Sequence, residues 1–324
     1  MKLSLTSVHK KMQAWVAMTL CCSAAAARAL GAEATSGAAG DKAGTPPPGA
    51  AEGSPGRAAA YLGQREWSQA INEFSEVLRL NPHDGSAYGY RGAAYWASGE
   101  FDKAISDFSR QIELQPTNSD AFFNRASAYR AKREFTNAVS DFSRCLELCP
   151  TNPLAYKTRA AVYNTMGEFG KAISDWTAGL QLGPADANAY ELRGYAYSQK
   201  GEFDKAVRDF SEAIHLDPNN DKAHDNLAWL RATCPIASLR SASEAMEAAR
   251  KACELTASSN WMCIDTLAAA FAEAGKFKEA AEHERQAMAL EGPSKDELKA
   301  MQARLLLYEQ RRPYRDARSR GLKK

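Results

Sequence analysis

A nine-residue pattern recurs every 34 residues through the middle of the chain, and it constrains the fold more than any other feature of the sequence. The pattern reads Glu-Phe-x-x-Ala-Ile/Val-x-Asp-Phe/Trp and begins at Glu100, Glu134, Glu168 and Glu202. Self-similarity at a fixed interval of about 20 to 50 residues is typical of arrays in which each unit buries its apolar face against the next. We therefore expect a linear array of units, although a chain of 324 residues could also hold two globular domains.

The repeats can be aligned as units of two helices. Units lie near 51–84, 85–118, 119–152, 153–186 and 187–220, and two less regular units lie near 221–260 and 261–294. Positions 8 and 20 carry small residues, as at Ala126 and Ala138, and aromatic residues stand at positions 11, 17 and 24, as at Tyr95, Phe101 and Phe108. Because the spacing within each half follows the helical period, it predicts two antiparallel helices that approach closely at the small residues.

Two further positions predict where the helices end. Position 15 is glycine in four units and suits the left-handed residue that ends a first helix, whereas Arg65 and Arg133 stand there in two others at a cost of about 1 kcal/mol. Position 32 is proline, which ends the second helix because it lacks a donor and clashes with the preceding turn. These prolines are Pro82, Pro116, Pro150, Pro184 and Pro218.

This combination of positions resembles the tetratricopeptide repeat family over about residues 51–294. The resemblance implies an all-α fold of about seven helix pairs, stacked into a right-handed superhelical solenoid whose concave groove holds a peptide or protein ligand. Residues 295–310 carry Leu298, Met301, Leu305 and Leu306 at helical spacing and are expected to form a helix that caps the last repeat. Residues 227–235, Leu-Ala-Trp-Leu-Arg-Ala-Thr-Cys-Pro, are similar to the C-terminal module of bacterial exported repeat proteins, with about five residues inserted at 234–240.

One departure from the family pattern suggests structural ion pairs. Position 7, usually leucine, is arginine in the regular units, and position 23 of the same units is acidic; in the last unit both change, to Leu267 and His283. We expect arginine–carboxylate pairs between facing helices. The expected pairs are Arg91 with Asp107, Arg125 with Asp141, Arg159 with Asp175 and Arg193 with Asp209, with Arg57 and Glu73 as a variant in the first unit.

The resemblance also nominates residues for partner binding, since in this family positions 2, 5, 9, 12 and 13 of the first helices face the groove. Aromatic and arginine side chains are the usual anchors of protein interfaces. The alternative is that Trp96 and Tyr195 only fill space between helices. The candidates are Trp96, Phe123, Arg130, Lys157, Asn164, Glu191, Tyr195 and Gln199.

The sequence offers no arrangement suited to catalysis, a cofactor or a metal, so we expect a protein that is not an enzyme. The histidines and the Ser-Asp pairs have no partners at useful spacing, and phosphate-loop and nucleophile-elbow motifs are absent. Five of the seven cysteines lie beyond the N-terminal segment, and an odd number cannot all pair. We expect them to be buried thiols, with one disulfide, such as Cys253 with Cys263, as the alternative.

The two ends of the chain differ from the repeats. Residues 1–29 combine four bases, no acid, an apolar run and small residues, as in a signal peptide. Several Ala-x-Ala windows are alternative cleavage sites, so the sequence does not fix the cleaved bond. Residues 30–56 read as a disordered Ala/Gly/Pro linker before a solenoid over 57–294. Residues 311–324 are a basic tail, expected as a solvated, frayed end or as a contact for an anionic membrane or cell-wall surface.

These features lead to an expected function and location. The formal charge changes from +2 to −2 without residues 1–29, so a broad nucleic-acid surface is not expected. We expect an exported scaffold, periplasmic or secreted in a bacterium, that binds a protein or peptide ligand in the repeat groove. The alternatives are an envelope-associated structural protein held by self-association or by its tail, and an organelle-targeted or lipidated form. Partner identity, pathway and oligomeric state are not encoded in any recognisable motif.

Overall fold

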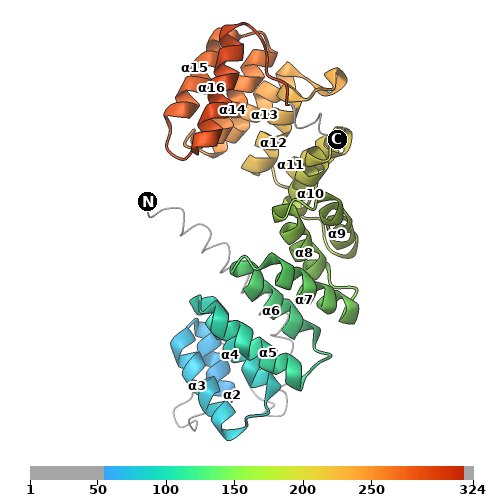
Figure 1. The fold of residues 1–324 in the computed structure, drawn as a ribbon, viewed down its shortest axis with the longest axis vertical. Helices are drawn as coiled ribbons and strands as arrows, with labels where there is room; N and C mark the ends of the chain where they lie inside the picture. The colour runs from blue at the N-terminus through green and yellow to red at the C-terminus, as the bar shows by residue number, and fades with distance from the viewer. Residues whose placement is uncertain (1–54, 317–324) are drawn as a thin grey trace, which may run out of the picture. The chain divides into compact units, whose positions relative to one another are not determined.

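The computed structural model describes residues 55–316, and every regular element in that range is helical. It contains fifteen α-helices and one short 3-10 helix, without a strand among these residues (Figure 1). The expected all-α class and the consecutive pairing of helices are confirmed. The expected signal peptide at 1–29, the linker up to residue 54 and the tail beyond residue 316 lie outside the described residues.

The described residues divide into two compact units, one ending at Cys149 and one beginning at Pro150. In the first unit the helix pairs are α2 (Pro55–Gln64) with α3 (Trp67–Leu80), α4 (Gly85–Ser98) with α5 (Phe101–Leu114), and α6 (Ser119–Ala131) with α7 (Phe135–Leu148). Helix α2 therefore begins inside the segment 30–56 that the sequence suggests as a linker.

The second unit contains four helix pairs followed by a single helix. The elements are α8 (Pro153–Thr165) with α9 (Phe169–Leu182), α10 (Ala187–Gln199) with α11 (Phe203–Leu216), α12 (Asp221–Thr233) with α13 (Ala242–Leu255), α14 (Trp261–Glu273) with α15 (Phe277–Ala289), and α16 (Lys295–Glu309). A short 3-10 helix, η1 (Ala237–Leu239), lies in the insertion between α12 and α13. In each unit consecutive helices pack side by side in chain order (Figure 1).

The ends of the helices follow from local chemistry. First helices begin after an Asn or Asp whose side chain accepts a hydrogen bond from the first turn, as Asp84 does from the Ala87 amide at 2.9 Å. Except for α12, which ends at Cys234 with φ of −51°, they end at a left-handed residue: Gly99 and Gly167 have φ of 86° and 75°, and Arg65 and Arg133 adopt 61° and 64°. The sequence prediction for position 15 is thus confirmed, including for the two arginines.

The small residues at positions 8 and 20 lie where the two helices of a pair touch. Ala126 and Ala138 are fully buried. A Cβ added at Gly92 would lie 2.8 Å from the Phe108 ring, and one at Gly194 would lie 2.9 Å from the Phe210 ring, which is closer than van der Waals contact allows. The aromatic ring at position 24 therefore occupies the space that glycine or alanine at position 8 leaves open.

The last pair is the most deeply buried part of the second unit. Every residue of α14 from Cys263 to Ala272 is buried, because α12, α13 and α15 pack around the helix. Within α16 the buried side chains are Met301, Arg304 and Tyr308, whereas Leu306 is 55% exposed. Of the four apolar residues at helical spacing, Leu306 is therefore exposed, and the inward face of α16 carries an arginine and a tyrosine beside Met301.

Candidate functional site

Each arginine at position 7 forms an ion pair with the aspartate at position 23 on the second helix of the same pair. Every guanidinium donates from Nε and Nη2 to the two carboxylate oxygens, at 2.7 to 2.9 Å. The structure brings together all four pairs: Arg91 with Asp107, Arg125 with Asp141, Arg159 with Asp175 and Arg193 with Asp209. Each of these aspartates is only 6% exposed. Such bidentate pairs have a planar geometry that the single ammonium group of a lysine could not reproduce.

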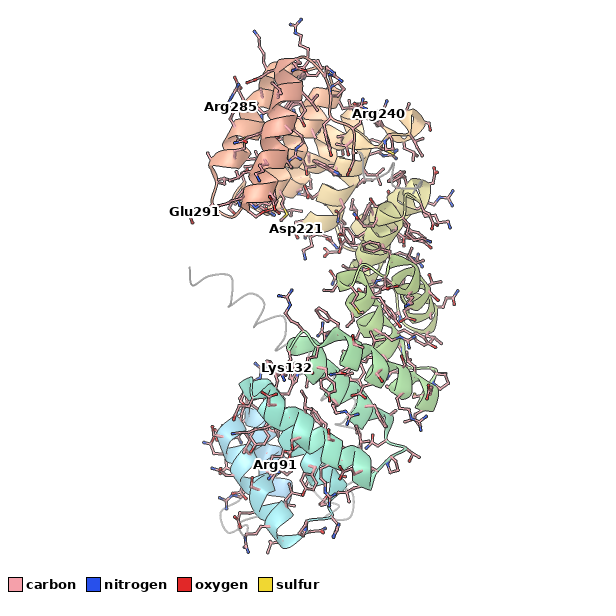
Figure 2. All side chains as sticks on the ribbon, in the orientation of Figure 1. Arg91, Lys132, Asp221, Arg240, Arg285 and Glu291 are labelled. Atoms are coloured by element: carbon pink, nitrogen blue, oxygen red, sulfur yellow. The ribbon has the colours of Figure 1, made fainter. Side chains whose placement is uncertain are left out.

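The same guanidinium groups also reach back to the preceding helix pair. Nη1 of Arg125 donates to the Ser109 hydroxyl oxygen at 3.0 Å, and that hydroxyl donates to the Ile105 carbonyl at 2.7 Å. Arg91 meets Ser75 and Arg193 meets Thr177 in the same way, at 3.1 and 3.3 Å. Figure 2 labels Arg91 within the first unit. Because Arg91, Arg125 and Arg193 each join three helices, they link neighbouring repeats. The hydroxyl at position 25 is the partner that sequence reasoning missed.

In the first unit, the predicted partner-binding residues lie mostly between helices. Phe123 is 5% exposed and meets the Phe142 ring edge-on, with centroids 5.4 Å apart. Trp96 is half-buried, and its buried Nε1 has no acceptor among the described residues. Burial lowers the pKa of Arg130. Phe123 is therefore a packing residue rather than an exposed anchor. Only part of the Trp96 ring is accessible to a binding partner.

In the second unit, three of the five predicted residues are used to join repeats. The Lys157 ammonium lies 3.0 Å from the Asp186 carboxylate, which also caps α10. The Asn164 amide donates to the Leu192 carbonyl at 3.0 Å. Glu191 is 6% exposed and accepts a hydrogen bond from the amide of Asn226 at 2.8 Å.

Tyr195 and Gln199 lie differently, on the outer surface of α10. Tyr195 is 37% exposed, and its ring meets Phe169 edge-on at 6.0 Å. Gln199 is half-buried and lines a surface pocket. Tyr195 is thus an exposed side chain of the second unit, and Gln199 is a partly exposed one at the wall of a pocket.

Position 5 of α10 and of α12 carries carboxylates in poorly solvated surroundings. Burial raises the pKa of Glu191 to about 7, with a smaller opposing effect from Lys222. Burial likewise raises the pKa of Asp225 to about 6, while Thr266 hydrogen-bonds it and lowers the value. These carboxylates therefore change charge within the neutral range, which no sequence motif indicates.

The last repeat replaces the arginine–aspartate pair with a different buried cluster. Arg304 of α16 reaches Asp265 of α14 at 2.8 Å and Glu284 of α15 at 3.2 Å, and Glu284 is fully buried. Burial, and then the Asp265 charge, raise the pKa of Glu284 well above its usual range. One cation thus serves two buried carboxyls, and burial raises the pKa of Asp265 as well as that of Glu284.

The segment after α16 is packed against the second unit, and the expectation of a solvated, frayed end is wrong for its first part. Residues 313–316 are each half-buried. The Tyr314 ring lies 5.9 Å from the Trp229 ring, centroid to centroid, and the Arg315 guanidinium lies 2.7 Å from the Glu273 carboxylate. The Asp316 amide donates to the Thr233 carbonyl at 3.1 Å. The positive charge of Arg315 is therefore used within the chain.

A surface pocket adjoins the end of this segment. Its walls come from α10, the start of α11, the end of α12 and the packed segment itself. They are formed by Ser198, Gln199, Phe203, Trp229, Leu230, Thr233, Cys234 and Asp316. Four of these residues occupy positions 9, 12 and 13 of first helices, where the family resemblance places ligand contacts.

Cys234, Cys253 and Cys263 are not in disulfides, and the thiols of Cys253 and Cys263 hydrogen-bond each other. Residues 55–316 hold no cluster of three or more His, Cys, Asp or Glu side chains that could bind a metal ion. None of the helices in this range is both long and apolar enough to cross a membrane.

The fold is similar to solved repeat structures. YrrB, described as "a TPR protein with an unusual peptide-binding site", has a TM-score of 0.53 and 18% identity over 60% of this chain and 97% of that chain. A chain of the APC/C hetero-tetramer Cut9-Hcn1 has a TM-score of 0.54 and 16% identity over 76% of this chain and 48% of that chain. At these identities the likeness shows the fold alone. MamA is 26% identical over 51% of this chain and 96% of its own, but a TM-score of 0.48 supports no inference.

Family models described as "Tetratricopeptide repeat" match residues 56–119, 92–153 and 187–220. No curated protein matches the chain. The likeness of residues 227–235 to an exported-protein module stays a prediction. Tetratricopeptide repeats are thus recognised in this chain over 56–153 and 187–220, on helices α2 to α7 and on the pair α10 and α11.

Proposed function

We propose that this chain is a non-catalytic scaffold that binds an extended segment of a partner protein on the faces of its first helices. The observation that carries the proposal is the pocket lined by Gln199 of α10 and by Trp229 and Thr233 of α12. Most other polar side chains predicted to bind a partner are already engaged between repeats, whereas Tyr195 is exposed on α10 and Gln199 lines the pocket. Aromatic rings beside hydrogen-bonding amides suit peptide recognition.

Substitution on α10 tests this proposal. Photo-crosslinking in native cells, followed by mass spectrometry, identifies the partner of the parent chain. The double variant Tyr195→Ala with Gln199→Ala should lose at least tenfold of the crosslinked partner while keeping its helical content and melting temperature. Leu182→Ala removes another exposed apolar side chain, 45% exposed at the end of α9, and serves as the matched control. Undiminished capture by the double variant would exclude this surface.

The proposed location is outside the cytoplasm, and residues 1–29 support it through their charge and apolar run. Fractionation of cells that carry the full chain should place it in the periplasm or the medium. Deletion of residues 1–29 should retain it in the cytoplasm. Envelope sedimentation that salt abolishes, and that is lost when residues 317–324 are deleted, would instead favour a structural role held by the basic tail.

A further inference from the structure

The C-terminal segment returns from the last helix to a much earlier one. Arg311 takes a left-handed conformation, with φ of 57°, just after α16. The chain then crosses α14 and α12, where residues 314–316 meet partners more than 80 positions earlier, such as Trp229 and Ala232. The surface that receives them consists of Trp229, Ala232 and Thr233 of α12 and Glu273 of α14, and we refer to it as the tail-docking face.

Each of the three side chains of this segment meets a different kind of group. The Tyr314 ring lies beside the Trp229 ring, and the Arg304 guanidinium lies 5.4 Å from the Trp229 centroid and 5.6 Å from that of Tyr314. The Arg315 guanidinium pairs with Glu273, which is held on its other oxygen by Arg240 at 3.0 Å. The Trp229 indole N–H donates to the Asp316 carboxylate at 3.2 Å. The face thus distinguishes an aromatic, a basic and an acidic side chain in that order.

The backbone of α12 supplies the remaining contacts. The helix ends at Thr233 before Pro235, so the carbonyls of its last turn have no donors within the helix. The Ala232 carbonyl accepts a hydrogen bond from Arg315 Nη1 at 3.4 Å, and the Thr233 carbonyl accepts one from the Asp316 amide. A cation near these carbonyls is also favoured by the helix dipole.

The segment is held like a ligand rather than like a core element. Residues 313–316 are all half-buried, whereas Tyr308 of the preceding helix is 1% exposed. The tail-docking face uses positions 9, 12 and 13 of first helices. The pocket beyond Asp316 continues the same line of positions onto Ser198 and Gln199 of α10, so the path stays open at its far end.

We propose that Tyr314, Arg315 and Asp316 are an internal ligand that occupies the peptide site of the second unit. A partner displaces it with an extended segment that presents an aromatic, a basic and an acidic side chain in the same order. This inference rests on the proposed function and names the chemistry of its partner. A tethered segment competes at an effective concentration of about 1 mM, so a segment whose own intrinsic Kd is below about 100 μM weakens the binding of a free peptide at least tenfold.

The test uses a fluorescent peptide of residues 311–324 as its probe, with binding followed by fluorescence anisotropy. Three chains are compared: the full chain, a chain that ends at Arg312, and the full chain with Tyr314→Ala and Arg315→Ala, which keeps its length. Both altered chains should bind the probe at least tenfold more tightly than the full chain. Glu273→Gln in the shortened chain should weaken binding about tenfold, and a peptide with the same residues in scrambled order should bind weakly.

Several results would overturn the inference. They are a folded shortened chain that does not bind the probe, equal binding by the full chain, and equal binding of the scrambled peptide, which would indicate charge attraction alone. Loss of helical content in both altered chains would make the segment a structural strut and also exclude it as a ligand. If the probe fails while the crosslinked partner still depends on Tyr195 and Gln199, the proposed function stands and only this inference falls.

Discussion

Arg125 and Asp141 form a two-pronged ion pair between the two helices of one repeat, with Nε–Oδ2 and Nη2–Oδ1 distances of 2.7 and 2.8 Å. The arginine side chain is 20% exposed and the aspartate side chain 8%. Since the aspartate has little access to water, its charge depends on the guanidinium for compensation. We therefore expect the ion pair to stabilise the packing of the two helices, unlike a solvent-exposed pair.

Removing one member of this pair should be more harmful than removing both. We expect Arg125→Leu to lower the free energy of unfolding by about 1 to 4 kcal/mol, because it leaves a buried carboxylate uncompensated. Arg125→Leu combined with Asp141→Leu should cost less. Urea unfolding of the two variants measures the difference, and a double variant as unstable as the sum of the single variants would contradict the pairing.

An exposed ion pair serves as the control for that experiment. Arg110 and Glu113 lie one turn apart on α5 at 2.6 Å, with side chains 41% and 62% exposed. Because water screens such pairs, Arg110→Leu should change the free energy of unfolding by less than about 1 kcal/mol.

The buried carboxyl of Glu191 should make stability depend on pH. Burial raises its pKa to about 7, above the value of about 4.3 expected in the unfolded chain. The folded state then binds the proton more tightly, so this contribution is fully present below about pH 4.3 and is lost as pH rises through 7. Between pH 5.5 and 8 the loss should amount to about 2 kcal/mol.

Glu191→Gln removes this titration while keeping the shape of the side chain. The variant should be more stable than the parent at pH 8 and should show a flatter dependence of unfolding free energy on pH. Glu147→Gln, at a side chain 63% exposed, is the control and should leave the slope unchanged. A Glu191→Gln variant with the pH slope of the parent would show that this carboxyl is better solvated than its position suggests.

The cluster around Arg304 should respond unequally to its two acidic partners. Arg304→Met leaves Asp265 and Glu284 buried without a cation and should cost about 3 to 5 kcal/mol. Glu284→Gln should cost less than about 1.5 kcal/mol, because the raised pKa of Glu284 favours its neutral form and the amide oxygen can still accept from Arg304. Unfolding midpoints in urea distinguish these outcomes, and a Glu284→Gln loss as large as that of Arg304→Met would show that Glu284 is ionised.

Replacing the left-handed arginine at the end of α6 should increase the stability of the protein. Arg133 has φ of 64° where other repeats use glycine, and its side chain is exposed. Arg133→Gly should raise the free energy of unfolding by about 0.5 to 1 kcal/mol, because the strain at Cβ exceeds the extra flexibility that glycine brings to the unfolded chain. Arg110→Gly within α5 should instead destabilise by about 1 kcal/mol. Thermal unfolding of both variants tests the opposite signs.

The regular helix pairs could be predicted from the sequence because their determinants recur at fixed positions. Ala126 and Ala138 mark the helix contact, and Gly167 marks a left-handed helix end. Arg125 and Asp141 occupy positions 7 and 23, which change together from one repeat to another. Each of these features depends on contacts within one 34-residue repeat or with the next repeat. A period of 34 residues therefore makes them visible as columns.

The features that depend on one-off, long-range contacts were decided only by the tertiary structure. Arg304 meets Asp265 and Glu284 because α16 packs where a further repeat would stand, and no repeated column signals that arrangement. Phe123 was expected at a surface and is buried against Phe142, because the neighbouring helices decide which side of α6 stays open. The sequence marks residues 311–324 only as basic, whereas the return of Tyr314 to Trp229 depends on a turn after α16 and on free carbonyls at the end of α12. Local periodicity determines the helices and their pairing, but a single contact between distant segments leaves no period to read.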